Sequence, residues 1–415
     1  MTTKVNVLKK EGIIYHLMDI KNVVLGLQHL IAMFGATVLV PILTGFDPSV
    51  ALFSAGVGTL IFHQVTDKKV PVFLGSSFAF IPLIIVVKEM FNGDLAYAQG
   101  GIVVAGLIYV LLSFMVKKVG IKKINEILPP QVVGPMIIVI GLNLIPVAYG
   151  MASVNFMLAG ITLFTALFIN FFTKGYTKQL TILGGVVAGY LVASVMGLVD
   201  TSIVAQTSWV SVPNFTLPKF SLQAILIIAP VVLAVFMEHV GDITTNGAVV
   251  GKNFIEDPGL NKTLLGDGLA TMFAGFVGGP ANTTYGENTG VLAITKNYNP
   301  AILRIAAIFA IVLALVSKVG STLKTIPVPV MGGISLMLFS MIAIIGVKTI
   351  KSNKVEMNFK NIIVMATILI LGFGGKYIEA KFGITLGIPV NENIAINGLS
   401  FAAIAGVVVN KILNK

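Results

Sequence analysis

The sequence contains no cysteine, one tryptophan, four histidines and few charged residues. Without cysteine the chain forms no disulfide, holds no thiolate-bound metal and has no cysteine nucleophile. Charged residues make up 11% of the 415 residues and hydrophobic residues 56%, with a mean hydropathy of +0.95. A soluble globular protein carries about 25% charged residues. This shortage of charge excludes an ordinary soluble protein and predicts a chain that lies in a lipid bilayer.

Catalytic and nucleotide-binding motifs are also missing. The chain has no Walker A loop, so we do not expect ATP-driven transport, and it has no HExxH or other spacing typical of a metal site. We therefore expect no enzyme, no cofactor and no bound metal. The net charge of +11 does not indicate a nucleic-acid partner, because the lysines stand between apolar runs, as in the loops of membrane proteins.

Apolar runs of about 20 residues, the length that spans a hydrocarbon core, recur along the chain. We expect an all-α polytopic membrane protein with fourteen transmembrane segments. The third and tenth segments are interrupted by glycine and proline, and the ninth is short. The expected segments are residues 22–44, 48–64, 71–88, 97–116, 127–147, 155–173, 179–199, 222–241, 263–277, 279–295, 300–317, 325–347, 359–376 and 392–410.

The distribution of lysine predicts the orientation of these segments. If the connections alternate between the two sides, 22 of the 28 basic residues fall on the side of the N-terminus. Basic residues favour the cytoplasmic side. We therefore expect both termini in the cytoplasm and a location in the cytoplasmic membrane. The longest outside connection, 200–221, carries Trp209, which is typical of an interfacial anchor.

The chain also shows signs of an internal duplication. Residues 129–135 (PPQVVGP) are similar to residues 327–333 (PVPVMGG), and the interrupted segment at 75–78 falls about half a chain before the one at 285–288. Because seven segments per half is an odd number, a duplication gives two inverted seven-segment repeats. A pair of interrupted apolar segments at matching positions points to the binding site of a transporter.

Glu287 is the most informative residue, because it lies in a polar, glycine-rich run (278–290, GGPANTTYGENTG) within an apolar chain. An ionisable group at membrane depth indicates a functional site. Pro280 prevents a continuous helix, so we expect an extended piece through Tyr285 and a helix that begins near Glu287. The unpaired N–H groups of that helix start would suit a carbonyl-bearing or anionic solute. The alternative is a structural ion pair with Lys296 or Arg304.

A second acidic group, Glu238 and Asp242, stands four residues apart and shares one helix face. Two carboxylates this close repel each other when both are ionised, which suits proton coupling. The alternative is that Asp242 reaches water and only caps the helix end. His239 points elsewhere, either toward the ligand or into helix packing.

Gln28 and His29 form an adjacent polar pair in the first segment. His29 could serve in proton transfer near the acidic residues. An interhelical hydrogen bond is the alternative.

These motifs together resemble the nucleobase–ascorbate transporter (nucleobase:cation symporter 2) family. Residues 287–296 (ENTGVLAITK) fit its signature of an acidic or amide residue, Asn-x-Gly, and a Thr followed by a basic residue. Gln28-His29 matches the family's pair in the first segment, and residues 238–241 (EHVG) match its acidic motif in the eighth. The resemblance covers essentially the whole chain, and the nearest branch is that of the bacterial uracil permeases.

The resemblance implies secondary active uptake of uracil by proton symport, with alternating access between a core domain and a gate domain. The core would comprise residues 1–116 (segments 1–4) and 201–318 (segments 8–11). The gate would comprise residues 117–200 (segments 5–7) and 319–415 (segments 12–14). Segments 3 and 10 would each begin with a short strand, with uracil between them. Motion of a core against a gate would suit a homodimer.

The resemblance also implies roles for individual residues. Glu238 and Glu287 would bind uracil, the backbone at Phe78 and Gly286 would bind its carbonyls, and Tyr285 would lie beside it. We expect proton coupling to involve Glu238, Asp242, His239 and His29. The family's uracil branch can carry His where this chain has Asp242, so the proton route at this position is an open point.

The residue chemistry agrees with uracil, which has two N–H donors for the carboxylates and two carbonyls for backbone N–H groups. The alternatives are a permease for xanthine or another purine, and an anion transporter or channel on the same architecture. In purine-transporting members Gln commonly occupies the position of Glu287, which favours a pyrimidine here. An anion site would more readily use a fixed cation than two carboxylates.

Overall fold

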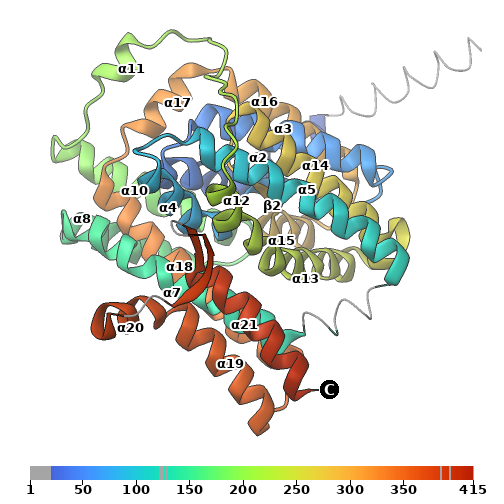
Figure 1. The fold of residues 1–415 in the computed structure, drawn as a ribbon. Helices are drawn as coiled ribbons and strands as arrows, with labels where there is room; N and C mark the ends of the chain where they lie inside the picture. The colour runs from blue at the N-terminus through green and yellow to red at the C-terminus, as the bar shows by residue number, and fades with distance from the viewer. Residues whose placement is uncertain (1–19, 121–125, 127–128, 384–385, 392–393, 415) are drawn as a thin grey trace, which may run out of the picture.

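The computed structural model describes residues 20–414 apart from 121–125, 127–128, 384–385 and 392–393 (Figure 1). The described chain is mostly helical. Among the described residues, six helical stretches are long and apolar enough to cross a membrane. They are α2 (Ile20–Thr44), α3 (Pro48–Val65), α5 (Ala96–Val119), α7 (Pro130–Ser153), the stretch Leu222–Val250, and α18 (Val328–Ser352).

The stretch Leu222–Val250 consists of α12 (Leu222–Ile228), the turn η2 (Ala229–Val231) and α13 (Val232–Val250). Shorter apolar helices are α8 (Phe156–Phe172), α10 (Thr181–Val195), α16 (Pro300–Ala314), α19 (Phe359–Gly372) and most of α21 (Gly398–Leu413). The remaining helices are η1 (Phe78–Phe80), α4 (Ile81–Met90), α9 (Tyr176–Gln179), α11 (Ser202–Gln206), η3 (Ile255–Gly259), α14 (Leu260–Val277), α15 (Gly286–Thr295), α17 (Ser317–Lys324) and α20 (Gly375–Phe382).

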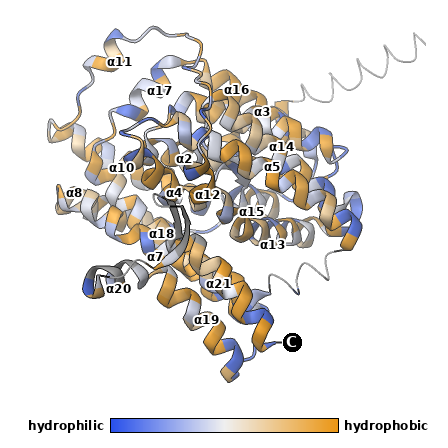
Figure 2. Cartoon of the chain, viewed as in Figure 1, coloured by the Kyte–Doolittle hydropathy of each residue, from blue (hydrophilic) through white to orange (hydrophobic). Residues whose placement is uncertain are grey.

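The helices pack into two groups. In the first bundle α14 packs against α3 and α5, α16 packs against α2 and α3, and α13 and α15 pack on each other. In the second bundle α7 packs along α18, α8 packs against α10 and α18, and α19 packs against α7 and α21 (Figure 1). Hydrophobic residues cover most helices of both bundles, whereas hydrophilic ones gather at helix ends and connections (Figure 2).

Glycines allow the closest helix approaches in both bundles. A Cβ on Gly106 of α5 would lie 2.7 Å from the carbonyl oxygen of Gly268 on α14. A Cβ on Gly346 of α18 would lie 2.6 Å from the carbonyl oxygen of Gly134 on α7. Small residues at such contacts let backbones meet, which increases van der Waals packing where lipid gives no hydrophobic driving force.

Two short strands cross inside the first bundle. β1 (Leu74–Ser76) pairs antiparallel with β2 (Asn282–Thr284), with Gly75 opposite Thr283. Beyond the strands, the N–H of Ser77 donates to the oxygen of Ala281, and the N–H of Tyr285 donates to that of Phe73. The polypeptide becomes helical after each strand, at η1 and α4 on one side and at α15 on the other.

Two of the expected segment boundaries are wrong. The eighth segment was expected to end at residue 241, but α13 continues to Val250, since Gly241 is tolerated inside the helix and Gly251 (φ +76°) ends it. The fourteenth segment was expected from residue 392, but Ile394–Asn397 forms β4, paired with β3 (Gly387–Asn391), and α21 begins at Gly398. The period-two alternation of Ile-Ala-Ile-Asn satisfies a strand better than a helix.

Candidate functional site

The crossing of β1 and β2 is held by polar side chains of the flanking helices. The Thr59 hydroxyl on α3 accepts the N–H of Leu74 at 2.9 Å, and the Thr271 hydroxyl on α14 donates to the oxygen of Asn282 at 3.0 Å. The Asn282 amide donates to the oxygen of Ser54 at 3.1 Å. Non-helical backbone at membrane depth persists only where it is buried in protein or lines a cavity. These hydrogen bonds pair the strand backbone with buried side chains and backbone of the flanking helices, so the crossing is buried in protein.

Tyr285, which directly follows β2, links the two strands through its side chain. Its side chain is buried, and its hydroxyl donates to the backbone oxygen of Ser76 at 2.8 Å. A Cβ on Gly75 would lie 2.4 Å from the tyrosine ring, so the ring fits only over a glycine. Tyr285 therefore fixes the strand crossing.

The open side of the crossing is lined by three carboxylates. Glu287 is the second residue of α15 and is half-buried, while Asp242 is half-buried and Glu238 is exposed on α13. α13 packs against α15 and β2, so the helices that carry the three side chains meet beside the strand crossing. The site is open there, because a Cβ on Gly286 or on Gly241 would meet no atom within 4 Å. The exposure of Glu238 thus shows that no other segment packs over this side chain.

Phe78 and Gly286 lie at the starts of the two helices that follow the strands. Phe78 is the first residue of η1 and is half-buried; Gly286 is the first residue of α15 and is exposed. The first N–H groups of a helix have no partner within it. Because β1 and β2 run antiparallel, the two helix starts lie at opposite ends of the strand pair, and Gly286 directly precedes Glu287.

Asp242 does not cap the end of its helix, which corrects one of the alternatives drawn from the sequence. α13 continues for two more turns, and the Thr284 hydroxyl at the end of β2 donates to Asp242 Oδ2 at 2.7 Å. The interaction ties α13 to the strand crossing. Asp242 is thereby part of the site.

His239 points away from this open space into α14. Its Nδ1 lies 2.9 Å from Asp267 Oδ2, and its Nε2 lies 3.0 Å from the Thr263 hydroxyl. All three side chains are buried. Sequence reasoning missed Asp267 and Thr263. The signal was a carboxylate inside the apolar run 263–277, the same kind of signal that singled out Glu287.

His29 lies in the contact between α2 and α15. It is buried, and the Asn288 amide donates to its backbone oxygen at 3.0 Å and lies 3.1 Å from its Nδ1. Asn246 makes a similar link on the other side, donating to the Thr289 hydroxyl at 3.1 Å. The interhelical hydrogen bond, one of the two interpretations of His29, is thus present, and α15 is fixed to both α2 and α13.

The ion-pair interpretation of Glu287 is not supported by the geometry. Among the described residues, the five ion pairs do not include Glu287. Lys296 is exposed at the end of α15, and Arg304 lies on α16, near His63 of α3. Within the described part of the chain, no group of three or more His, Asp or Glu side chains is placed to hold a metal ion.

The chain is similar to known permeases in sequence and to a known transporter in fold. A model of the permease family (xanthine and uracil permeases) matches residues 20–381. The chain is 40% identical over 406 residues to a "Probable uracil permease" of Haemophilus influenzae, covering 95% of each. It is also 40% identical over 407 residues to the "Uracil permease" of Bacillus caldolyticus, covering 94% of this chain and 91% of the other.

Among solved structures, the fold is similar to that of the murine anion transporter Slc26a9. The TM-score is 0.69 at 12% sequence identity, and the match covers 95% of this chain and 68% of the other. At such low identity the likeness concerns the fold alone.

Proposed function

The chain belongs to the nucleobase–ascorbate transporter family of permeases, and we propose on this premise that it takes up uracil by proton symport. It is a multi-pass membrane protein and a transporter, not an enzyme. The uracil permeases that are 40% identical to it support uracil as the substrate. The observation that carries the proposal is the packing of α13, which bears Glu238 and Asp242, against β2 and against α15, which bears Glu287.

In this proposal the fourteen segments form two inverted repeats. The first bundle corresponds to a core made of residues 1–116 and 201–318, and the second to a gate made of residues 117–200 and 319–415. The two packing groups support this division. The antiparallel pairing of β1 with β2 supports an inverted relation between segments 3 and 10, since an in-plane pseudo-twofold would bring equivalent strands together.

Glu238 and Glu287 accept the two N–H groups of uracil in this scheme. Backbone N–H groups at Phe78 and Gly286 donate to its carbonyls. Tyr285 contributes by fixing the strands on which these groups stand. A hydrogen bond to a charged group contributes about 1.5–3 kcal/mol, and a buried donor left unpaired costs about 1–3 kcal/mol. Cytosine, which lacks the hydrogen on N3, is therefore disfavoured.

In this scheme the carboxylates of α13 bind the coupled proton. Glu238 and Asp242 share one face and are both reached by the open space, so a proton on one of them relieves their mutual repulsion. The hydrogen bond from Thr284 links this change to β2. His239 would act through Asp267, and His29 through Asn288. The proposal includes a cytoplasmic-membrane location with both termini in the cytoplasm, and a homodimer.

The alternatives have less support. A purine permease would share the architecture, but the named relatives carry uracil, and Glu287 offers an acceptor where an amide is typical of purine transporters. An anion transporter would share the fold with Slc26a9. Three carboxylates around the open space would repel an anion.

The direct test is uptake of labelled uracil into proteoliposomes with an imposed pH gradient. We expect saturable uptake that is faster when the outside is acidic and that collapses with a protonophore. Uptake of the same rate with and without the gradient would rule out proton symport. A competition panel of uracil, cytosine, xanthine and bicarbonate separates the alternatives in the same vesicles.

A further inference from the structure

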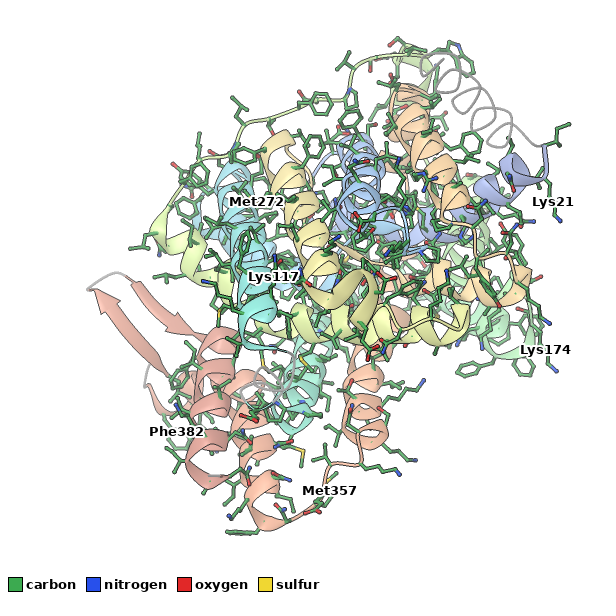
Figure 3. The ribbon with its side chains drawn as sticks, turned by 90° about the vertical axis from the view of Figure 1, so that its right-hand side faces the viewer. Lys21, Lys117, Lys174, Met272, Met357 and Phe382 are labelled. Carbon is green, nitrogen blue, oxygen red and sulfur yellow. The ribbon has the colours of Figure 1, made fainter. Side chains whose placement is uncertain are left out.

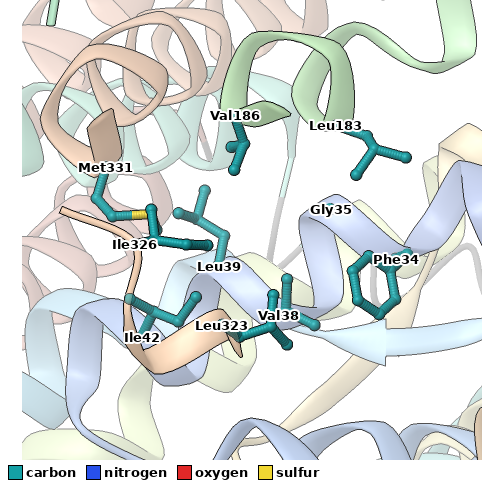
Figure 4. Close-up of a pocket in the computed structure, with 10 residues that line it drawn as sticks. All are labelled: Phe34, Gly35, Val38, Leu39, Ile42, Leu183, Val186, Leu323, Ile326 and Met331. Carbon is teal, nitrogen blue, oxygen red and sulfur yellow. The ribbon is translucent and has the colours of Figure 1, made fainter. Parts of the chain in front are cut away.

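The seam between α2 and α10 is apolar and incompletely packed. An apolar cavity of about 30 Å³ lies along it, at the junction with α17 and the start of α18 (Figure 4). Its lining includes Phe34, Val38, Leu39, Leu183, Val186 and Ile326. A cavity of this size has room for only about two or three water molecules. Side chains that face such a void lack dispersion contacts on one side, so the packing here is incomplete.

Near this void α2 and α10 approach each other closely through apolar side chains. A Cβ on Gly35 of α2 would lie 2.9 Å from Ile182 Cγ2 and 3.2 Å from the backbone nitrogen of Leu183. A glycine against apolar side chains gives close contact without a directional bond. Such a surface can slide, because no hydrogen bond between these residues has to break.

Polar contacts occur at one end of this seam, where the short helix α9 meets both α2 and α15. The Tyr176 hydroxyl donates to the backbone oxygen of Gln28 on α2 at 3.2 Å. The Gln179 amide covers Gly290 on α15, where an added Cβ would lie 2.6 Å from its nitrogen and 2.8 Å from its oxygen. Lys21 near the start of α2 and Lys174 just before α9 lie at the same side of the molecule (Figure 3).

These two contacts reach the helices that carry the site. Gln28 precedes His29, which is bonded to Asn288, and Gly290 follows Glu287 by three residues, about one helical turn. α9 joins α8 to α10 in the second bundle, while α2 and α15 belong to the first. The contacts therefore cross from one bundle to the other beside the candidate site.

We propose that α9 is a latch, in which Tyr176 and Gln179 hold α2 and α15 in their observed register and release them in every transport cycle. This inference rests on the proposed function, because a latch between bundles matters only if the bundles move. The apolar seam is the sliding surface and the latch sets its resting register. Neither residue touches the substrate, so both are positioning residues.

The chain provides a matched control for Tyr176. The Tyr190 hydroxyl, on α10, makes a hydrogen bond with the Thr325 hydroxyl at 2.8 Å, at the junction that leads into α18. Both ends of that bond lie in segments assigned to the gate. Tyr176→Phe and Tyr190→Phe each remove one hydroxyl from half-buried positions, but Tyr176→Phe alone removes a bond between the bundles.

The first experiment measures the register without any substrate. Since the chain has no cysteine, Lys174→Cys and Lys252→Cys create two spin-label sites on exposed positions of the second and first bundles. Pulsed dipolar spectroscopy in nanodiscs should give two distances. Tyr176→Phe should change their population ratio about 2- to 10-fold, the effect of one neutral hydrogen bond, while Tyr190→Phe leaves it unchanged. An equal response to both variants, or none to Tyr176→Phe, would overturn the latch.

The second experiment locks the latch. A short bifunctional thiol reagent joins Gln28→Cys to Tyr176→Cys, and dithiothreitol releases it. Linked protein should bind uracil in detergent as the unlinked protein does, yet transport it at less than a tenth of the unlinked rate. Transport at the unlinked rate would overturn the latch. Absence of uracil binding in the parent chain would count against the proposed function instead, and the distance measurement would still decide the latch.

Discussion

The two bundles differ sharply in what they bury. Charged and histidine side chains buried among the described residues, namely His29, His63, His239 and Asp267, all belong to the first bundle. The second bundle buries six polar residues in its described part, all small or neutral: Thr162, Thr181, Ser321, Ser335, Asn361 and Asn410. Both bundles are built from apolar helices that meet at glycines. The difference lies in polar chemistry rather than in packing.

This contrast has a physical cause. Interrupting a helix within a membrane leaves backbone groups that must be paired, and the first bundle contains two such interruptions. Thr59, Thr271 and Asn282 meet that need. The second bundle keeps continuous helices around its packed core and needs few buried polar side chains. Buried ionisable side chains therefore concentrate in one bundle.

The largest expected effect tests whether the first bundle binds uracil through Glu287. Glu287→Gln replaces a charged acceptor with an amide, which should weaken uracil binding by at least about 10-fold and up to about 150-fold. Isothermal titration in detergent measures this directly. Glu356→Gln, an exposed position beyond α18, is the control and should bind normally. Unchanged affinity in Glu287→Gln would break the assignment of recognition to this site.

The second prediction compares glycines of the two bundles. Gly75→Ala places a methyl group 2.4 Å from the Tyr285 ring and should destabilise the protein by about 1–3 kcal/mol and abolish most uptake. Gly160→Ala on α8 meets no atom within 4 Å and should be neutral, or stabilising by up to about 1 kcal/mol. Thermal unfolding followed by light scattering and near-UV signals gives both values. Equal effects would show that the strand crossing has no special packing demand.

The third prediction separates bonds to interrupted backbone from bonds within a helix. Thr271→Val removes the donor to the buried oxygen of Asn282 and should cost about 1–3 kcal/mol. The Thr165 hydroxyl on α8 bonds the Ile161 oxygen of its own helix, so Thr165→Val should stay within about 0.5 kcal/mol. Urea or heat titration of each variant in the same detergent is the measurement. A cost for Thr165→Val as large as that for Thr271→Val would contradict the explanation.

The smallest expected effect concerns an exposed polar pair of the first bundle. The hydrogen bond from Lys219 and the one from the Ala96 N–H hold the pKa of Asp94 below its usual value. A lowered pKa means that the stabilisation is present above the unfolded value near 3.8 and is lost as the pH falls through the lower folded value. Lys219→Ala should therefore lower Tm slightly at pH 7, with the difference closing in acid and at high salt. A large decrease in Tm that does not depend on salt would show that an exposed polar pair also contributes strongly to stability.

Several features of the site could be predicted from the sequence because they rest on local rules. Pro280 and the glycine-rich run predicted the interruption before Glu287, and α15 begins at Gly286. The family and the multi-pass class followed from motifs and apolar runs and are confirmed. Contacts between distant segments could not be predicted in this way. The pairing of His239 with Asp267 and of Asp242 with Thr284 joins residues 28 and 42 positions apart, which no periodicity encodes.

Tyr285 is a second example of a contact that the sequence alone does not reveal. The family resemblance implies that it lies beside the substrate, which stays a prediction. The fold shows its hydroxyl bonded to the oxygen of Ser76, 209 positions away. Its ring requires the absence of a side chain at Gly75. That requirement exists only once the two strands have crossed.

By itself the sequence determined that this chain lies in a membrane, where its helices are interrupted, and which carboxylates stand in apolar segments. These follow from hydropathy, proline and glycine, which act over one or two turns. Only the tertiary structure decided that Glu238, Asp242 and Glu287 share one open space, that Asp267 supports His239, and that α9 joins the two bundles. The reason is that these arrangements depend on which helices pack together, a choice made by surfaces from the whole chain at once.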